Sequence, residues 1–321
     1  ELTLWKREIN LVESNLGIVL AREYVKQYFS PKSKQMMEEM ILYFKEVFND
    51  MLKCSFMSDE TKKHAFTKLS KMNFKIGYPD EWTDTSTLQL DDTLDSLIKI
   101  KCRINEWWYY YDNRLIFKPV DVNEWYILPH QVNAYYSPLL NEIVFPAGIL
   151  QPPFFSEDYS LELNYGRIGV VIAHEITHGF DDQGRKFDSD GNLNNWWLTD
   201  DITKFEAETK KLVEQFNQIE IYQMKLNGKL TLGENLADLG GVRISLEALK
   251  RNYKKLYGTE IPDDRLKSFF EGYAFFWRNV CTLETGQQLF KTDPHSPGKY
   301  RVDGILPHID FVQFEPATPR A

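Results

Sequence analysis

The amino-acid sequence predicts a mainly α-helical protein with a small β region, which places it in the α+β class. Apolar residues recur at helical spacing in several long stretches, whereas β-branched and aromatic residues interrupted by prolines concentrate between residues 125 and 144. A chain of 321 residues is long enough for a substantial core and for two lobes. The stretch 81–95, rich in Thr, Asp and Ser, is the best candidate boundary, so we divide the chain into residues 1–85 and 86–321.

Two helices are expected in the first part of the chain. Ser30-Pro31 combines a capping side chain with a proline at the first helical position, which is typical of a helix start. The apolar positions behind it recur at helical spacing and are interpreted as core: Met37, Met40, Ile41, Phe44, Val47, Phe48, Met51 and Leu52. A second helix begins at Ser58 and ends before Gly77, and it is expected to bury Ala65, Phe66, Leu69 and Met72.

The second part of the chain begins with another predicted helix, at about residues 94–111. Its five consecutive aromatic residues, 107–111, are expected in the core because aromatic side chains dominate buried area. Short extended pieces with turns follow at residues 125–144, and we expect no other β structure. A helix at about residues 164–180, a loop and several further helices complete the prediction.

Composition argues against several classes of protein. A formal net charge of −9 does not suit a general nucleic-acid binder, since phosphate contacts need clustered Lys and Arg. Cys54, Cys102 and Cys281 are odd in number and far apart, so they indicate neither a disulfide framework nor a cysteine zinc site. The sequence has no Asn-x-Ser/Thr acceptor, and we expect no signal peptide or membrane span within it. These features lean towards an intracellular or microbial setting and leave the oligomeric state open.

The strongest single motif is His174-Glu175-Ile176-Thr177-His178. On a helix this spacing puts two imidazoles on one face about one turn apart, where they can share a metal ion, and Glu175 lies beside that ion without ligating it. The run before the motif is apolar, so the helix is expected to be buried and its histidines need partners. Two unrelated histidines on a helix face remain the alternative, because five-residue matches also arise by chance.

A catalytic zinc ion normally has three protein ligands and one open position, so a third ligand must come from elsewhere. The stretch 233–241 is the natural source, because Glu234 and Asp238 share a helix face at four-residue spacing. Glu234 would complete the ligand set, and Asp238 would accept the free ring N–H of a ligand histidine. A helix start with two solvated carboxylates is an equally open interpretation of this stretch alone.

Four long motifs extend the pattern beyond the histidines. They are VNAYY at residues 132–136, FPAGILQPPFF at 145–155, HEITHGFDDQG at 174–184 and GENLADLGG at 233–241. KIGYP at residues 75–79 and HSPGKYR at 295–301 also fit, so the likeness covers nearly the whole chain. In this order they resemble the neprilysin and endothelin-converting-enzyme family of zinc endopeptidases. The resemblance implies a thermolysin-like zincin catalytic lobe.

The resemblance also implies how a metal is held. It implies one zinc ion per chain on His174, His178 and Glu234, with Glu175 as the general base and Asp238 supporting a ligand histidine. In the expected mechanism zinc lowers the pKa of its bound water and polarises the peptide carbonyl, while Glu175 takes a proton and later delivers one to the leaving amine. We assign Asp238 to orienting a histidine rather than to proton donation, because a carboxylate paired with a ligand histidine has little reason to hold a proton.

Peptide substrates are the partners that the resemblance implies. Asn133 and Ala134 match positions that hold the substrate backbone as an added strand. His295 matches the position that stabilises the oxyanion, and Arg301 the position that grips a substrate carbonyl. Four residues fall where the family forms its apolar pocket for the residue after the cleaved bond: Ile149, Phe154, Val171 and Trp277.

The sequence also departs from the family pattern. Arg278 follows Trp277 where members facing the outside carry a cysteine, and the usual terminal cysteine and tryptophan are replaced by a segment through Pro316 and Pro319. The family's chain is longer upstream. We therefore interpret residues 1–85 as the remnant of a helical lobe that caps the active site, and residues 86–321 as the catalytic lobe.

The leading hypothesis is an endopeptidase or oligopeptidase that cuts on the amino side of an apolar residue. Its rival is a catalytically weak or inactive relative, a zinc-containing protein that binds a peptide or a partner. An intact Glu175 speaks against this rival, because a structural zinc site usually closes with four protein ligands and has no use for a free base. A purely structural helical scaffold would leave Glu175, Glu234, Asp238 and His295 unexplained.

Overall fold

A computed structural model of the chain describes residues 3–91, 94–221 and 223–309. Helices form most of it, with a few short strands, so the predicted α+β class is confirmed. The predicted departure at Pro316 and Pro319 lies outside the described residues. In chain order the elements are α1 (Leu4–Tyr28), α2 (Pro31–Lys53), α3 (Asp59–Lys71), β1 (Asn73–Gly77), α4 (Leu97–Asn113), β2 (Tyr135–Ser137), β3 (Glu142–Pro146), α5 (Leu161–Asn164), η1 (Tyr165–Gly169), α6 (Val170–His178), η2 (Gly184–Lys186), α7 (Thr199–Phe216), β4 (Glu220–Ile221), β5 (Met224–Lys225), α8 (Leu232–Tyr257), α9 (Asp263–Phe276), α10 (Leu283–Thr292), α11 (Gly298–Asp303) and η3 (Leu306–His308).

Helices α2 and α3 begin where the sequence predicts. The Ser30 hydroxyl accepts a hydrogen bond from the Ser33 backbone N–H at 3.0 Å, and Pro31 occupies the first turn of α2. Ser58 caps α3 in the same way. The apolar stripe predicted for α2 is buried, apart from Met51, which is partly buried. The predicted burial holds for Ala65 and Leu69 in α3 and for Met72 directly after it, whereas Phe66 is only partly buried.

A three-stranded sheet has the order β1-β3-β2, with β1 parallel and β2 antiparallel to β3. Strands β2 and β3 lie largely within the predicted range 125–144, but the expectation of no other β structure was wrong, because β1 lies far upstream and β4 and β5 form a second sheet downstream. Lys75 gives β1 a polar appearance in the sequence. In the fold its ammonium is buried and pairs with the buried Glu142 carboxylate of β3 at 2.7 Å.

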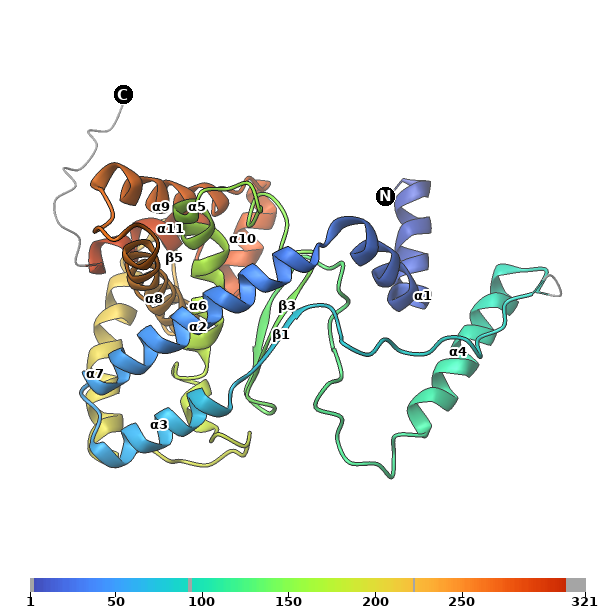
Figure 1. Cartoon of the computed structure of the whole chain (residues 1–321), viewed down its shortest axis with the longest axis horizontal. Coiled ribbons are helices and arrows are strands. Elements are labelled where there is room, and N and C mark those ends of the chain that lie inside the picture. Colours follow the sequence, from blue (N-terminus) through green and yellow to red (C-terminus); the bar gives the residue numbers. More distant parts are fainter. Residues whose placement is uncertain (1–2, 92–93, 222, 310–321) are drawn as a thin grey trace.

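The aromatic cluster at residues 107–111 is not part of the core, which corrects the prediction. In the described part of α4 only Ile104 is buried, and Tyr109 and Tyr110 are 64% and 66% exposed. Figure 1 shows why: α4 lies away from α6 and α8, and its packing partner is α1. The rings of Trp107, Trp108 and Tyr111 contact one another instead.

Contacts cross the predicted boundary near residue 85. Helix α2 packs on α8, and β1 pairs with β3, so the segment from residue 31 to residue 77 adjoins the elements that carry the metal-binding motif. The division of the chain at this point stays a prediction. Within the described residues no helix combines the length and the apolar character that spanning a bilayer requires. The thiols of Cys54, Cys102 and Cys281 are exposed and unpaired.

Helices α6 and α8, which carry the two halves of the candidate metal site, pack closely against each other. A Cβ on Gly240 would lie 2.3 Å from the Thr177 hydroxyl. A Cβ on Gly241 would lie 2.8 Å from the Val170 carbonyl oxygen and 3.1 Å from the His174 backbone nitrogen. Glycine at position 241 therefore lets the α8 backbone touch the α6 backbone, and glycine at position 240 makes room for the Thr177 side chain.

Gly241→Ala should push α6 and α8 apart and lower the free energy of unfolding by about 1–3 kcal/mol, the usual cost of overpacking. Gly272→Ala in α9 is the matched control, because its new methyl would make ordinary contacts at 3.4 Å and would gain helix propensity. Urea titration of both variants measures the difference. A Gly241→Ala protein as stable as Gly272→Ala would contradict this description of the helix contact.

Candidate metal centre and active site

Helix α6 presents the first half of the site from inside the core. Its apolar side chains are buried, apart from the partly buried Val171, and a π-helical turn at residues 165–169 precedes it. The Ser245 hydroxyl of α8 donates a hydrogen bond to the Tyr165 carbonyl of this turn at 2.7 Å. Turns of this kind are frequent at functional sites. Helix α6 ends at His178, so both histidines of the motif lie in its last two turns.

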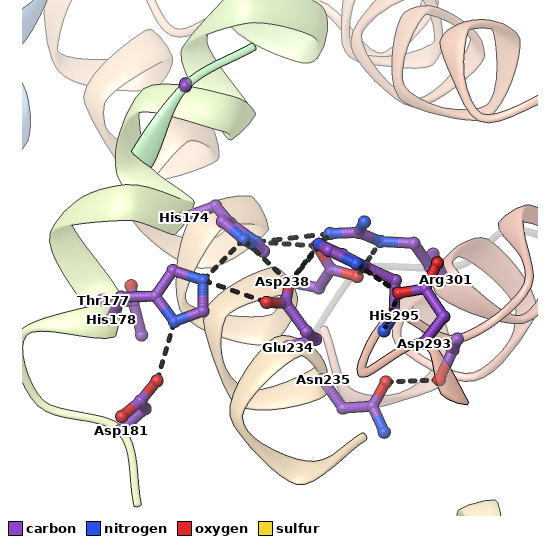
Figure 2. A network of polar contacts seen from close by, with 12 residues as sticks. His174, Thr177, His178, Asp181, Glu234, Asn235, Asp238, Asp293, His295 and Arg301 are labelled. Carbon is purple, nitrogen blue, oxygen red and sulfur yellow. Dashed lines mark hydrogen bonds and ion pairs between the residues drawn. The ribbon is translucent and has the colours of Figure 1, made fainter. Parts of the chain in front are cut away.

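Three candidate ligand groups converge between α6 and α8. The Nε2 atoms of His174 and His178 are 2.9 Å apart. Glu234, in the first turn of α8, places Oε2 3.2 Å from His174 Nε2 and Oε1 3.6 Å from His178 Nε2. Figure 2 shows the two rings and this carboxylate turned towards one another. Of the described residues, these three form a group whose donor atoms could hold one metal ion.

A carboxylate stands behind each ring. Asp238 Oδ1 lies 2.9 Å from His174 Nδ1, and Asp181 Oδ2 lies 2.7 Å from His178 Nδ1. Both carboxylates are buried. Asp181 is fixed in turn, since its Oδ1 accepts the backbone N–H groups of Gln183 and Gly184 at 2.8 and 2.6 Å.

The donor set fits zinc. Ionised carboxylates only accept hydrogen bonds, so the proton of each neutral ring belongs on Nδ1 and the lone pairs of both Nε2 atoms face each other. Two lone pairs 2.9 Å apart are repulsive unless a cation lies between them. Zinc bonds of about 2.0–2.2 Å put tetrahedral ligand atoms roughly 3.3–3.5 Å apart, close to the separations seen between these three side chains.

The electrostatics also favour a cation here. Burial by itself would lower the pKa of His174, but Asp238 and Glu234 outweigh burial and raise it to about 9. Burial would raise the pKa of Glu234, and the neighbouring His174 and His295 instead hold it far below its usual range. The carboxylates therefore draw positive charge to the ring nitrogens, and a divalent ion supplies such charge.

Glu175 lies beside this group without belonging to it. Its side chain is largely buried and lines a cavity of about 420 Å³ together with His174. Among the described residues its carboxylate forms no hydrogen bond or ion pair. A carboxylate of this kind, beside the ligand nitrogens and open to a cavity, is free to accept a proton from a bound molecule.

The same cavity collects the residues that the resemblance assigns to substrate. Its lining includes Asn133 and Ala134, which directly precede the edge strand β2. It also includes the four apolar residues Ile149, Phe154, Val171 and Trp277. His295 and Arg301 complete the wall, so all seven predicted substrate contacts and the predicted oxyanion residue border one space.

Arg301 and His295 are anchored to the metal-binding half of the site. The Arg301 guanidinium binds Asp238 with two nitrogens, at 2.7 and 2.6 Å, and stacks 3.6 Å from the Trp277 ring centre. His295 Nε2 lies 3.1 Å from Glu234 Oε2, and this contact raises the pKa of His295. Asp293 holds the other ring nitrogen of His295 at 2.7 Å.

Comparison with known proteins places this geometry in a family. Residues 133–317 match the model of peptidase family M13, and residues 1–79 match a second model with the same description. The chain belongs to peptidase family M13. The predicted likeness to neprilysin and endothelin-converting enzyme is thereby confirmed.

Similar M13 proteins come from animals and bacteria. The chain is 38% identical to human endothelin-converting enzyme 1 and to neprilysin-1 of Caenorhabditis elegans, over 94% of its own length in both cases. Its fold resembles that of the zinc metalloprotease ZMP1 of Mycobacterium tuberculosis, solved with an inhibitor, with a TM-score of 0.85 and 38% identity over 95% of this chain. PepO of Lactobacillus rhamnosis matches with a TM-score of 0.78 and 32% sequence identity over 91% of this chain.

These M13 relatives are longer than the chain described here. The chain spans 40% of the human enzyme, 42% of the nematode protein and 47% of the solved mycobacterial chain. It thus spans less than half the length of each of these relatives.

Two supporting residues were not predicted from the sequence. Asp181 lies within the HEITHGFDDQG stretch, three residues after His178, and that spacing could have indicated its contact with the outer ring nitrogen. Asp293 behind His295 could have been found in the same way, as the carboxylate two residues away.

Asp181→Asn should weaken zinc binding by about 10–100-fold, the usual effect of removing a carboxylate behind a ligand histidine. The substitution keeps an oxygen for the backbone N–H groups and removes the charge facing His178. Competition with a chromophoric chelator measures the affinity. Asp190→Asn, an exposed carboxylate in the same loop, should leave it unchanged, and equal losses in the two variants would contradict the assignment.

Proposed function

We propose that this chain is the catalytic part of a zinc-dependent endopeptidase or oligopeptidase that cuts on the amino side of apolar residues. The observation that carries the proposal is the position of Glu175. Its carboxylate, which forms no hydrogen bond or ion pair with any residue that the structure describes, lines the same cavity as the candidate ligand His174. Asn133 and Ala134, which precede the open edge of β2, line that cavity too. Membership of family M13 supports the same activity.

His174, His178 and Glu234 would hold the metal, one ion per chain. Zinc bound there would supply a Lewis acid for the peptide carbonyl and would lower the pKa of water. Asp181 and Asp238 keep the protons of the two rings on their Nδ1 atoms, which leaves both Nε2 atoms free for the ion.

Glu175 acts as the base in this proposal. It accepts a proton from the attacking water and returns a proton to the leaving amine nitrogen. Burial in the cavity wall excludes bulk water from around it. A structural zinc site would have no use for such a residue, so Glu175 favours hydrolysis over the alternative of a binding protein.

The substrate backbone would extend the sheet at β2. Strand β2 pairs with β3 on one side only, so its other edge can take a further strand. Asn133 and Ala134 lie at the entrance of that edge and line the cavity. Main-chain hydrogen bonds there would give affinity without selecting a sequence.

Selectivity would come from the apolar part of the cavity. Ile149, Phe154 and Val171 line it near Glu175, and an apolar side chain placed among them would leave water. This arrangement supports a preference for an apolar residue directly after the cleaved bond.

His295 and Arg301 would act on the carbonyl groups of the substrate. His295 is about half exposed to the cavity and can donate to a developing oxyanion. Burial by itself would raise the pKa of Asp238, but Arg301 and His174 hold it below its usual value, so Asp238 stays ionised. We therefore assign Asp238 to holding His174 and Arg301 in place, and not to donating a proton.

Glu175→Gln should retain zinc and lose about 10²–10⁴-fold in kcat, because the ligands stay and the base is removed. Glu234→Ala should lose both zinc binding and hydrolysis, since a candidate ligand is removed. Zinc content and cleavage of a quenched apolar peptide report the two effects, with the exposed Glu271→Gln as control. A Glu175→Gln protein that cleaves as fast as the parent would refute the assigned mechanism.

A mixed peptide library, incubated with and without a chelator, tests the activity itself. We expect cuts that need zinc and that precede Phe, Leu, Ile or Val, read by mass spectrometry. Zinc-replete protein that makes no chelator-sensitive cut would instead favour the peptide-binding or partner-binding alternative.

A further inference from the structure

Lys68 of α3 is a fully buried cation that the proposed chemistry does not use. Its relative exposure is 0%. Its ammonium donates hydrogen bonds to the Gly184 and Phe187 carbonyl oxygens, each at 2.7 Å. The rings of Tyr136, Phe180 and Trp196 lie around it, with centres 5.7–5.9 Å away. Lysine is almost never buried without strong partners, so this position calls for a reason.

Both hydrogen-bond acceptors of the Lys68 ammonium, the carbonyl oxygens of Gly184 and Phe187, belong to the loop that follows α6. Among the described residues no carboxylate lies within ion-pair distance of the ammonium, so backbone carbonyls satisfy it. Burial lowers the pKa of Lys68 to about 8, against the opposing effect of Asp181 and Asp188. Because a pKa of about 8 still lies above neutral pH, the Lys68 ammonium is mostly charged and the loop holds a positive charge at its centre.

A short series of contacts connects Lys68 to a candidate ligand. Lys68 Nζ binds the carbonyl of Gly184, whose N–H donates to Asp181 Oδ1 at 2.6 Å. Asp181 Oδ2 then meets His178 Nδ1 at 2.7 Å. The loop packs tightly against the end of α6, because a Cβ on Gly184 would lie 1.8 Å from the His178 carbonyl oxygen. Displacing the Gly184 peptide would therefore displace the carboxylate that orients the ring.

A second set of bonds fixes the same region from the sheet. Asn141, in a left-handed conformation with φ of 46°, donates from its side chain to the Lys68 and Ser189 carbonyl oxygens at 3.0 and 3.3 Å. The Tyr136 hydroxyl donates to Asn141 Oδ1 at 3.1 Å. Helix α3, the β2–β3 turn and the loop after α6 are thus joined around Lys68.

We propose that Lys68 is a positioning residue of the metal centre, which fixes the His178 ring by holding the Gly184 peptide and, through it, Asp181. The proposal rests on the proposed function in one respect, that His178 binds zinc. It assigns to α3, more than a hundred residues upstream of the motif, a direct part in the preorganisation of a ligand.

The test is the zinc affinity of Lys68→Met in the full chain. We expect a loss of about 10–100-fold, measured by competition with a chromophoric chelator, because the substitution keeps the length of the side chain and removes the donor. Lys71→Met is the matched control. It lies in the same helix, its ammonium pairs with the exposed Asp190 of the same loop at 2.7 Å, and its affinity should equal that of the parent.

A double-mutant cycle with Asp181→Asn separates a positioning role from a general loss of stability. If Lys68 acts through Asp181, the double variant should lose no more zinc affinity than the weaker-binding single variant. Losses that multiply would overturn the proposed connection. An unchanged affinity in Lys68→Met, with zinc still bound by the parent, would overturn the positioning role and leave the proposed function intact.

Circular dichroism of the metal-free proteins checks the fold. If Lys68→Met does not fold, Lys68→Gln, which keeps one donor group, is measured in its place and should show an intermediate loss. Failure of both to fold would show that Lys68 serves the fold as a whole and would overturn the positioning role. A parent chain that binds no zinc would refute the proposed function and, with it, this inference.

Discussion

The candidate site depends on how closely α6 and α8 approach each other. Gly241 lets the two backbones touch and Gly240 admits the Thr177 side chain, which brings Glu234 within 3.2 Å of the His174 ring and 3.6 Å of the His178 ring. A methyl group at Gly241 would meet the backbone of His174 itself. The spacing of the candidate ligands is therefore set by backbone contact, which is stiffer than any contact between long side chains.

Each ring is then fixed from behind by a carboxylate from a different part of the fold. Asp238 comes from α8 and is held by Arg301 of α11, whereas Asp181 comes from the loop after α6 and is held by that loop's own N–H groups. This arrangement directs both Nε2 atoms to one point and, within the described residues, leaves the Glu175 carboxylate without a hydrogen bond or ion pair. Four carboxylates therefore lie around the two histidines and differ in role because their surroundings differ. They are Glu234 as a candidate ligand, Asp181 and Asp238 behind the rings, and Glu175 beside the cavity.

Much of this site could be predicted from the sequence because its spacing is local. Two histidines four residues apart and two carboxylates four residues apart each define one helix face, and both faces form as expected. The start of α2 at Ser30-Pro31 could also be predicted, since a capping side chain and a proline act within one helical turn. That the two faces meet could not be derived from spacing, and it was known only through resemblance.

Burial elsewhere in the fold has a different cause. Pairing with Glu142 allows Lys75 to be buried, and hydrogen bonds to backbone carbonyls allow Lys68 to be buried. The aromatic residues of α4 were predicted to lie in the core, yet α4 packs on α1 and lies away from α6 and α8. In each case burial was decided by a distant segment, and no periodicity in the sequence records which segment that is.

The central claim is that α6 and α8 form an open zinc site with three protein ligands. X-ray absorption at the zinc edge of the loaded protein tests it most directly, because the spectrum distinguishes imidazole, oxygen and sulfur ligands. The account predicts one zinc per chain with two imidazoles, oxygen ligands and no sulfur, and a changed spectrum when a small hydroxamate takes the open position. A sulfur ligand, a single imidazole, or a spectrum with four protein ligands that the hydroxamate leaves unchanged would contradict it.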